Sequence, residues 1–330
     1  PIEDTTFAVT VVSDGGNKYA IDGVELASRA VFAGGFSSAD PYALNVMDYI
    51  SISSTGNATD FGDLTSVRGG CAGLASATRG VAGGGLTSGF STSGQDFMDY
   101  ITISSTGNGT DFGNLSLGRN SLGACNSATR GIFFGGRTGT GNTGNDTIDY
   151  ITIGSTGNAT DFGDATTNFL YVAGTSSSTR GVFGGAYEHQ DHIDYITIAS
   201  AGGGTDFGNL SLGRHGMGAL SNGTRACFGG GTNTDSSLSV RGSQDIIDYI
   251  TIASTGNAAD FGDLTERRKQ SAGAGSSTRG IFAGGFNPSS VRVDTMDYIT
   301  IGSTGNATDF GDLTQGRDEL AGMSNVNGGL

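Results

Sequence analysis

The chain has little cysteine, proline or positive charge, and it has no tryptophan. Its 330 residues include three cysteines, three prolines, 17 basic and 32 acidic residues. Three widely separated cysteines (Cys71, Cys125 and Cys227) fit neither a disulfide framework nor a metal cluster, so we expect small buried thiols. The formal charge of −15 repels phosphate backbones and anionic lipid, which argues against nucleic acid as a partner and against membrane insertion. No run approaches the roughly 20 apolar residues of a membrane-spanning helix.

Glycine is the residue present in excess. It occurs 60 times without a Gly-X-Y period, which excludes collagen, and the scarcity of proline argues against a low-complexity linker. Hydrophobic residues make up 35% of the chain and recur at fixed places. A core can therefore be buried, but it is divided among many small units.

A repeat of about 50 residues runs through the chain in six copies. The tripeptide Asp-Tyr-Ile begins at Asp48, Asp99, Asp149, Asp194, Asp248 and Asp297. Twelve residues after each of these stands an Asp followed by Phe-Gly, at Asp60, Asp111, Asp161, Asp206, Asp260 and Asp309. Eight residues further on, the third copy has Phe169 and the other five have an arginine, namely Arg68, Arg119, Arg214, Arg268 and Arg317. Eleven residues later a second arginine opens the next apolar run, at Arg79, Arg130, Arg180, Arg225 and Arg279.

The two ends of the chain supply complementary parts of one repeat. The last copy lacks the Arg-Gly-apolar-Gly-Gly segment, which stands near the start instead as residues 29–35. An open solenoid has no need of this permutation, whereas a ring closes its seam with a blade built from both ends. We therefore predict an all-β fold, a six-bladed β-propeller closed by N- and C-terminal segments that share one blade. Residues 28–330 would form the propeller, and residues 1–27 an N-terminal extension with a β-hairpin over residues 7–23.

Each copy indicates four short strands, here named a to d, and helical periodicity appears nowhere. In the second copy the strands are predicted over residues 68–75, 80–84, 97–104 and 110–115. Residues 98–103 alternate between apolar and polar with period two, as in a half-buried strand. The Ser-Thr-Gly-Asn between strands c and d suits a tight turn, and the small residues of strand a suit the crowded centre of a propeller.

Together these features resemble the kelch repeat, a β-propeller unit. The kelch pattern has Gly-Gly at the end of the second strand, Tyr in the third and an aromatic residue at the start of the fourth. Gly83-Gly84, Tyr100 and Phe112 stand in those places, with Phe instead of the usual Trp. The amino-acid sequence of the repeat is also similar to the repeats of kelch-like proteins of tailed phages of marine bacteria. That resemblance implies a tail- or surface-associated virion protein with a virion or extracellular location.

Variation in length is confined to the connection between strands b and c. From the second arginine to the next Asp-Tyr the six gaps are 19, 20, 19, 14, 23 and 18 residues, whereas the rest of each copy keeps its length. In a propeller the b–c and d–a connections emerge on one face, and insertions confined to one face are typical of binding. Unrestrained drift is the alternative, but drift would change both faces. The candidate ligand-binding residues of this face are Tyr42, Phe90, Arg137, Tyr187, His189, His192, Arg241, Asn287 and Arg292.

The motifs predict neither a catalytic centre nor a metal site. The Asp60 row lacks the spacing of a calcium loop, so we expect it to bond turn amides or to pair with an arginine row. The arginine rows are expected to bridge neighbouring blades. The Glu-His-Gln-Asp-His of residues 188–192 resembles a metal cluster, but its spacing is weak support for zinc. A nucleophile elbow, a Ser-His-Asp order and a phosphate-binding glycine motif in a strand–helix context are all missing from the sequence.

Three functions stay open. The favoured one is a non-enzymatic virion module, without cofactor, that presents its b–c loops to a host surface molecule or to another virion protein. The second is a cellular kelch-type protein-interaction domain, and the third is a propeller enzyme such as a lyase or an oxidase. An enzyme would need titratable groups at the central pocket, which the small residues of strand a do not offer. A homo-oligomer is compatible with all three.

Overall fold

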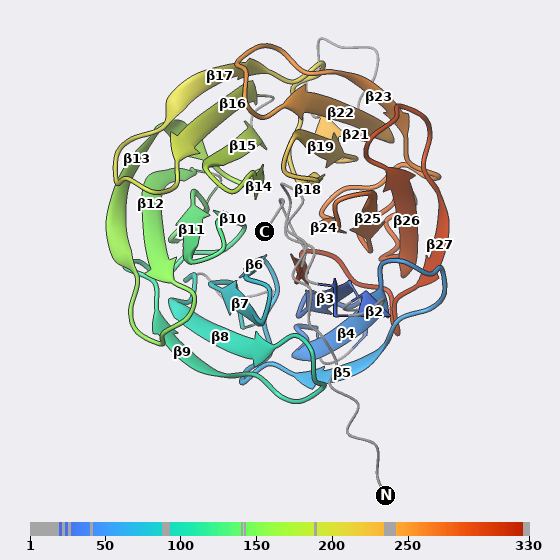
Figure 1. The fold of residues 1–330 in the computed structure, drawn as a ribbon, viewed down its shortest axis with the longest axis horizontal. Helices are drawn as coiled ribbons and strands as arrows, with labels where there is room; N and C mark the ends of the chain where they lie inside the picture. Colours follow the sequence, from blue (N-terminus) through green and yellow to red (C-terminus); the bar gives the residue numbers. More distant parts are fainter. Residues whose placement is uncertain are drawn as a thin grey trace, which may run out of the picture.

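Six sheets of four antiparallel strands surround one axis, as Figure 1 shows. The structure is a computed structural model that describes residues 20–21, 24–25, 28–39, 42–87, 93–139, 141, 143–187, 190–233 and 242–325. These described residues form no helix, and so they contain no helix that is long and apolar enough to cross a membrane. The prediction of an all-β, six-bladed propeller is confirmed.

In every blade the strand order from the axis outward is a, b, c, d (Figure 1). The seam blade and blades 2 and 3 are β28 (Ala321–Ser324), β3 (Arg29–Ala33), β4 (Val46–Ser51), β5 (Thr59–Asp63); β6 (Ala72–Ala75), β7 (Arg79–Gly83), β8 (Phe97–Thr102), β9 (Thr110–Asn114); and β10 (Gly123–Asn126), β11 (Arg130–Phe134), β12 (Asn145–Thr152), β13 (Thr160–Phe169). Blades 4 to 6 are β14 (Ala173–Ser176), β15 (Arg180–Ala186), β16 (Gln190–Thr197), β17 (Thr205–Asn209); β18 (Gly218–Ser221), β19 (Arg225–Gly229), β22 (Ile246–Thr251), β23 (Ala259–Asp263); and β24 (Ala272–Gly275), β25 (Arg279–Ala283), β26 (Thr295–Thr300), β27 (Thr308–Asp312).

The seam blade joins strands from opposite ends of the chain. β28 pairs antiparallel with β3, with Ala321 opposite Ala33 and Ser324 opposite Ala30. The backbone N–H of Arg29 donates to Oδ1 of Asn325, 296 residues away. A ring closed by a shared blade, as the permuted repeat predicted, is what the structure shows.

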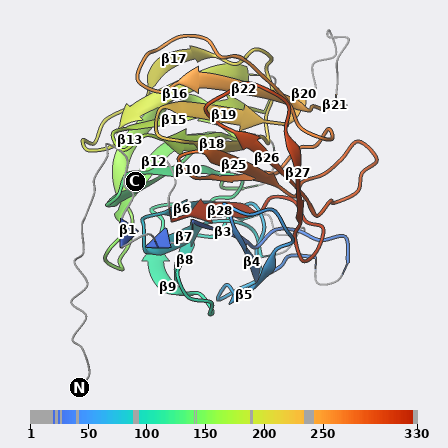
Figure 2. The same cartoon turned by 45° about the vertical axis from the view of Figure 1, so that its right-hand side comes forward.

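Two short ladders lie outside the blades. β20 (Thr232–Asn233) pairs with β21 (Gly242–Ser243) inside the longest b–c connection. β1 (Ala20–Ile21) pairs with β2 (Val24–Glu25) ahead of the propeller, and Figure 2 shows β1 on the far side of the ring from β20 and β21. The predicted hairpin over residues 7–23 falls largely on residues 1–19, which lie outside the described part of the chain.

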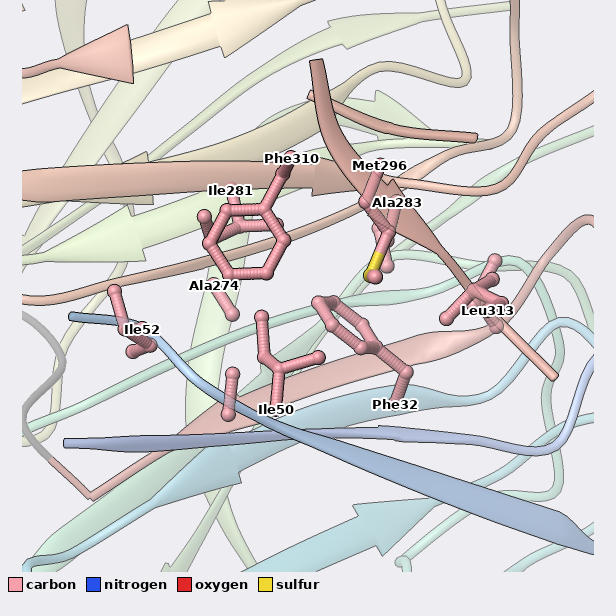
Figure 3. Close-up of a cluster of buried hydrophobic side chains, with 12 residues drawn as sticks. Phe32, Ile50, Ile52, Ala274, Ile281, Ala283, Met296, Phe310 and Leu313 are labelled. Atoms are coloured by element: carbon pink, nitrogen blue, oxygen red, sulfur yellow. The ribbon is translucent and has the colours of Figure 1, made fainter. Parts of the chain in front are cut away.

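The hydrophobic core lies between neighbouring blades. Figure 3 shows one of its clusters, in which Phe32 and Ile50 of the seam blade pack against Ile281, Met296 and Phe310 of blade 6. Equivalent clusters occupy the other five blade interfaces. Because each sheet is apolar on both sides, no blade can bury its surface alone, and the ring is stable only as a whole.

The arginine that opens strand b bridges each blade to the next. In blade 2 the guanidinium of Arg79 lies 4.4 Å from the ring centre of Tyr100 and donates to the carbonyl of Ile153 in blade 3, at 3.0 Å. The same pair of contacts recurs in every blade, at Arg29, Arg130, Arg180, Arg225 and Arg279. The predicted bridging by this arginine row is confirmed.

The c–d turn of each blade also reaches its neighbour. Oδ1 of Asn57 accepts from the backbone N–H of Asp312 at 3.1 Å, and the asparagines at the same position repeat this in four other blades. Blade 4 has Gly203 at this position, and there the backbone bonds of Gly202 and Gly204 to blade 3 remain. The turns therefore keep one length in every copy because each one joins two blades.

Candidate functional site

The b–c and d–a connections meet on one face of the ring, which confirms the predicted polarity. In each blade the residue that follows the buried-arginine position bonds through its backbone to that blade's own b–c connection. The six contacts join Asp318 to Phe36, Gly69 to Leu86, Asn120 to Arg137, Leu170 to Tyr187, His215 to Thr232 and Lys269 to Phe286. We call this surface the b–c face.

A closed ring of backbone hydrogen bonds surrounds the axis at the centre of the b–c face. Its members, one from each blade and here named the inner ring, are Gly70, Ser121, Tyr171, Gly216, Gln270 and Glu319. All six have φ between +53° and +70°. Each N–H donates to the carbonyl of the preceding member over 2.5 to 3.0 Å, and the N–H of Gly70 closes the circle on Glu319. Left-handed backbone costs a non-glycine residue about 1–2 kcal/mol, which the shared hydrogen bonds offset.

The inner ring surrounds the mouth of a central cavity of about 110 Å³. Below the ring, the walls are formed by the first residues of the strands a, which are mostly glycine and alanine, as the sequence predicted. Pockets for drug-sized molecules have roughly 300–1,000 Å³, so this cavity can take only a small group. Whatever enters it meets small side chains and backbone groups and, at the mouth, the side chains of the inner ring.

Glu319 is the acidic member of the inner ring. Its Oε1 accepts from Nε2 of Gln270 at 2.6 Å, and its Oε2 accepts from Oγ of Ser121 at 3.3 Å. Burial between the blades and the adjacent charge of Asp318 raise the pKa of Glu319 to about 7. The carboxyl therefore changes charge near neutral pH, at the mouth of the cavity.

Aromatic side chains gather on the opposite side of the inner ring. The rings of Tyr171 and Tyr187 lie 5.6 and 5.2 Å from the ring of His215. The guanidinium of Arg137 lies 5.9 Å from the Tyr171 ring, and its Nε donates to Oδ1 of Asn120 at 3.0 Å. Burial, followed by the charge of Glu319, raises the pKa of Tyr171 to about 12, so its hydroxyl keeps its proton. Two predicted residues, Arg137 and Tyr187, thus lie beside the cavity mouth.

A second group holds two more of the predicted residues. Nε of Arg292 donates to Oδ1 of Asp318 at 2.6 Å and its NH2 donates to the hydroxyl of Tyr42 at 2.7 Å. The same guanidinium lies 4.8 Å from the Tyr42 ring and 5.3 Å from the Phe286 ring. Asn287 follows in the chain, and its Oδ1 accepts from the backbone N–H of two residues of its own loop. Asn287 is therefore a turn residue, and Tyr42 and Arg292 belong to one packed cluster.

Beneath the b–c face, buried ion pairs fix the d–a connections to the blades. Arg68 is fully buried and pairs with Asp99 at 3.1 Å, while Thr65 donates to the same carboxylate through its N–H and its hydroxyl. The other pairs, over 2.6 to 3.0 Å, are Arg119 with Asp149, Arg214 with Asp248, Arg268 with Asp297 and Arg317 with Asp48. This second arginine row is also architectural, but the expectation that it bridges neighbouring blades is wrong. Each arginine pairs with an aspartate of its own blade, as Arg68 does with Asp99 of β8.

The prediction that the Asp60 row bonds turn amides or pairs with an arginine row was wrong. The arginines pair with the Asp48 row, and Asp60 and its equivalents are exposed. A β-bulge in the c–d ladder between Met47 and Asp48 explains the difference, because it turns both side chains toward the interior. The asparagines of the Asn57 row bond backbone N–H groups instead, and these belong to strand d of the neighbouring blade, as that of Asp312 in β27 (Thr308–Asp312) does.

His192 replaces the missing arginine of the third copy. Phe169 stands at the arginine position before blade 4, and Asp194 there receives Nε2 of His192 at 2.9 Å and the hydroxyl of Thr166 at 2.8 Å. The imidazole is stacked on Phe169 with 6.3 Å between ring centres. The His192 side chain is 28% exposed and engaged by Asp194 and Phe169, and its role as a ligand-binding residue stays a prediction.

Other predicted residues fall outside the described part of the chain or are inert. Phe90, His189 and Arg241 are not among the described residues. The three cysteines are buried and unbonded to one another, as predicted, and burial raises the pKa of each thiol. Within the described ranges, no group of three His, Cys, Asp or Glu side chains could hold a metal ion.

The inner ring is what sequence reasoning missed. Strand a is shorter than predicted, since β6 begins at Ala72 and Gly70 has left-handed backbone. The sequence offered no cluster of titratable groups at the centre, whereas the structure places Tyr171 and Glu319 at the cavity mouth. A signal was available: the two positions after the first arginine differ in nearly every copy, while the arginine itself is kept in five of six.

Comparison with known proteins adds no relative. No protein-family model matches the chain, and no curated protein matches it. The resemblance to kelch repeats and to phage proteins therefore has no support beyond the residues that carry it.

Proposed function

We propose that the chain is a non-enzymatic binding propeller that uses the centre of the b–c face to hold a partner. The observation that carries this is the placement of sequence variation. The copies keep the residues that hold the ring together, with Gly203 and Phe169 as exceptions, yet they differ at the inner ring, at the position before it and in the b–c connections. Variation that is confined to one face around a cavity is typical of a recognition surface.

The constant positions have structural reasons, so their constancy needs no ligand. The Asn57 row, the Arg79 row and the pairs of the Arg68 type each join two parts of the ring. The inner ring closes through its backbone in all six blades, whereas its side chains make different contacts in different blades. Differences there are therefore better explained by recognition than by architecture.

The chemistry near the cavity favours binding over catalysis. The buried thiols and Tyr171 have raised pKa values and stay protonated at neutral pH, which makes them poor nucleophiles. The acidic side chain of Glu319 at the cavity mouth and the formal charge of −15 favour a partner with positive charge. The small cavity favours one side chain of a protein over a sugar ring.

We further propose that the partner is a host surface molecule or a neighbouring virion protein, and that the chain is a tail- or surface-associated virion component. This rests on the resemblance of the repeat to kelch-like phage proteins. The alternative is a cellular protein-interaction domain of the same fold. Mass spectrometry of purified particles distinguishes the two, because only a virion component is enriched with the particle.

The binding surface itself is tested by variants on the two faces. Arg137→Ala on the b–c face should weaken capture of particle or host proteins, since Arg137 lies beside the cavity mouth. Thr106→Ala, in an exposed c–d turn, is the matched control on the opposite face and should leave capture unchanged. Equal loss in both variants, or in neither, would contradict a binding role for the b–c face.

A further inference from the structure

Among the described residues, the Glu319 carboxylate has no ion pair with an arginine or histidine, unlike the buried aspartates of the Asp48 row. The buried carboxylates of the Asp48 row each lie within 3.1 Å of an arginine or histidine nitrogen, and Asp318 lies 2.6 Å from Arg292. Glu319 has hydrogen bonds from Gln270 and Ser121, both of which are neutral. A carboxylate held by neutral donors inside a protein favours a cation at its remaining acceptor sites.

The arginines near Glu319 are engaged elsewhere. Arg137 and Arg292 lie close enough to oppose the rise in the pKa of Glu319. However, Arg137 donates to Asn120 and to the carbonyl of Gly141, and Arg292 donates to Asp318 and Tyr42. The charge of Glu319 is therefore left for a group that comes from outside the described chain.

The shape of the inner ring leaves room for that group. Oε2 of Glu319 lies 2.8 Å from the place where a Cβ of Gly70 would stand, so the carboxyl reaches over a position without a side chain. Gly216, the other glycine of the inner ring, lines the cavity, and Cγ of Gln270 lies 3.3 Å from the place where its Cβ would stand. Both glycines also have left-handed backbone, and neither places a side chain at the mouth of the cavity that Glu319 lines.

Size and wall chemistry restrict the cation. A cavity of about 110 Å³ between alanine and glycine walls suits a compact ammonium group with its methylenes. A hydrated divalent ion would need several oxygen ligands, and Glu319 offers a single carboxylate. A guanidinium needs a planar bidentate partner, but both oxygens of Glu319 already accept hydrogen bonds.

We propose that Glu319 and the inner ring bind a primary ammonium group, either the side chain of a lysine of the partner or a free small amine. The ammonium donates to the Glu319 carboxylate and to neighbouring ring oxygens, with the aromatic cluster of Tyr171 opposite. This inference rests on the proposed function, because it names the group by which the b–c face holds its partner.

Calorimetric titration of the full chain at pH 8 tests this site with three probes. Methylammonium represents a free amine, N-acetyl-lysine methylamide represents a lysine of a polypeptide, and the ε-acetylated form of the latter is the uncharged control. We expect saturable binding of a charged probe and no binding of the acetylated one. Methylammonium alone would assign the site to free amines, and binding of the lysine probe assigns it to a polypeptide partner.

Two variants separate the site from general charge. Glu319→Gln keeps the shape of the side chain and should weaken binding about thirtyfold or more, the equivalent of losing about 2 kcal/mol for one partner of a buried charge pair. Asp191→Asn removes the same charge at an exposed site and should bind like the unchanged protein. Undiminished binding by the Glu319 variant, no binding of either charged probe, or tighter binding of an arginine probe would overturn the proposal.

Failure of this proposal is distinguishable from failure of the proposed function. Capture of a partner that responds to Arg137→Ala, but not to Glu319→Gln, would leave the b–c face as a binding surface and reject the ammonium site. If the charged probes bind but the variants on the b–c face do not change partner capture, the ammonium site is kept and the b–c face is rejected as the surface that holds the partner.

Discussion

Replacing Arg119 by phenylalanine should destabilise the ring, and a second substitution should repair it. Arg119 pairs with Asp149 at 2.6 Å, and neither side chain is exposed. Arg119→Phe leaves the carboxylate with only its bonds from Ser116. Removing one partner of a buried ion pair costs about 3–5 kcal/mol. At about 2–4 °C per kcal/mol for a chain of this size, we expect Tm to fall by roughly 10 °C.

The repair copies the arrangement of blade 4. There Phe169 stands at the arginine position, and His192, two residues before Asp194, supplies the nitrogen that bonds the carboxylate. Thr147 stands two residues before Asp149. Adding Thr147→His to Arg119→Phe should therefore reverse more than half of the decrease in Tm.

Thermal unfolding followed by circular dichroism measures both steps, with Thr147→His alone as the control. The reasoning is refuted if Arg119→Phe melts like the unchanged protein. It is refuted equally if the double variant melts no higher than Arg119→Phe, since His192 would then not be a substitute for arginine.

Three further substitutions or deletions test other parts of the structure. Arg79→Ala removes a stacking contact with Tyr100 and a bridge to blade 3, and should lower Tm measurably in a melting experiment; an unchanged Tm would reject the bridging role. Deleting residues 317–330 removes strand a of the seam blade and should abolish cooperative melting, and a truncated protein with a sharp transition would contradict closure at the seam. Because the folded state raises the pKa of Glu319 from 4.5 to about 7, its carboxyl favours folding when protonated and its contribution declines as pH rises through 7. The free energy of unfolding of Glu319→Gln should therefore exceed that of the unchanged protein by an amount that grows between pH 4.5 and 8, up to about 3 kcal/mol. Chemical denaturation at several pH values measures this difference, and a difference that does not change with pH would contradict the prediction.

The sequence could predict the ring because the repeat carries its constraints in order. The Asp-Tyr-Ile spacing and the displaced segment of residues 29–35 sufficed for the number of blades and for the seam. The sequence could not tell which aspartate row is buried, because the bulge between Met47 and Asp48 interrupts the alternation on which such a prediction depends.

The candidate site was harder to predict than the fold. The variable b–c connections pointed to the correct face, and Arg137, Tyr187, Tyr42 and Arg292 lie on it. The inner ring was concealed because its backbone is left-handed at ordinary residues such as Glu319, a conformation that sequence patterns do not indicate. The spacing of the repeat also could not reveal that His192 takes over the role of the arginine that Phe169 replaces, because His192 and Phe169 belong to different strands.

The seam blade places a demand on how the molecule reaches its folded state. Arg29 and Asn325 bond across 296 residues, so strand b of this blade waits for its inner neighbour until nearly the whole described chain has been synthesised. Meanwhile β3 presents an unpaired edge, and five near-copies of β28 within the same chain offer it the same register. At high concentration a second chain offers β28 itself. Intermolecular exchange of β28 would produce linked rings. Because contacts across 296 residues form slowly, refolding at low concentration would favour single rings.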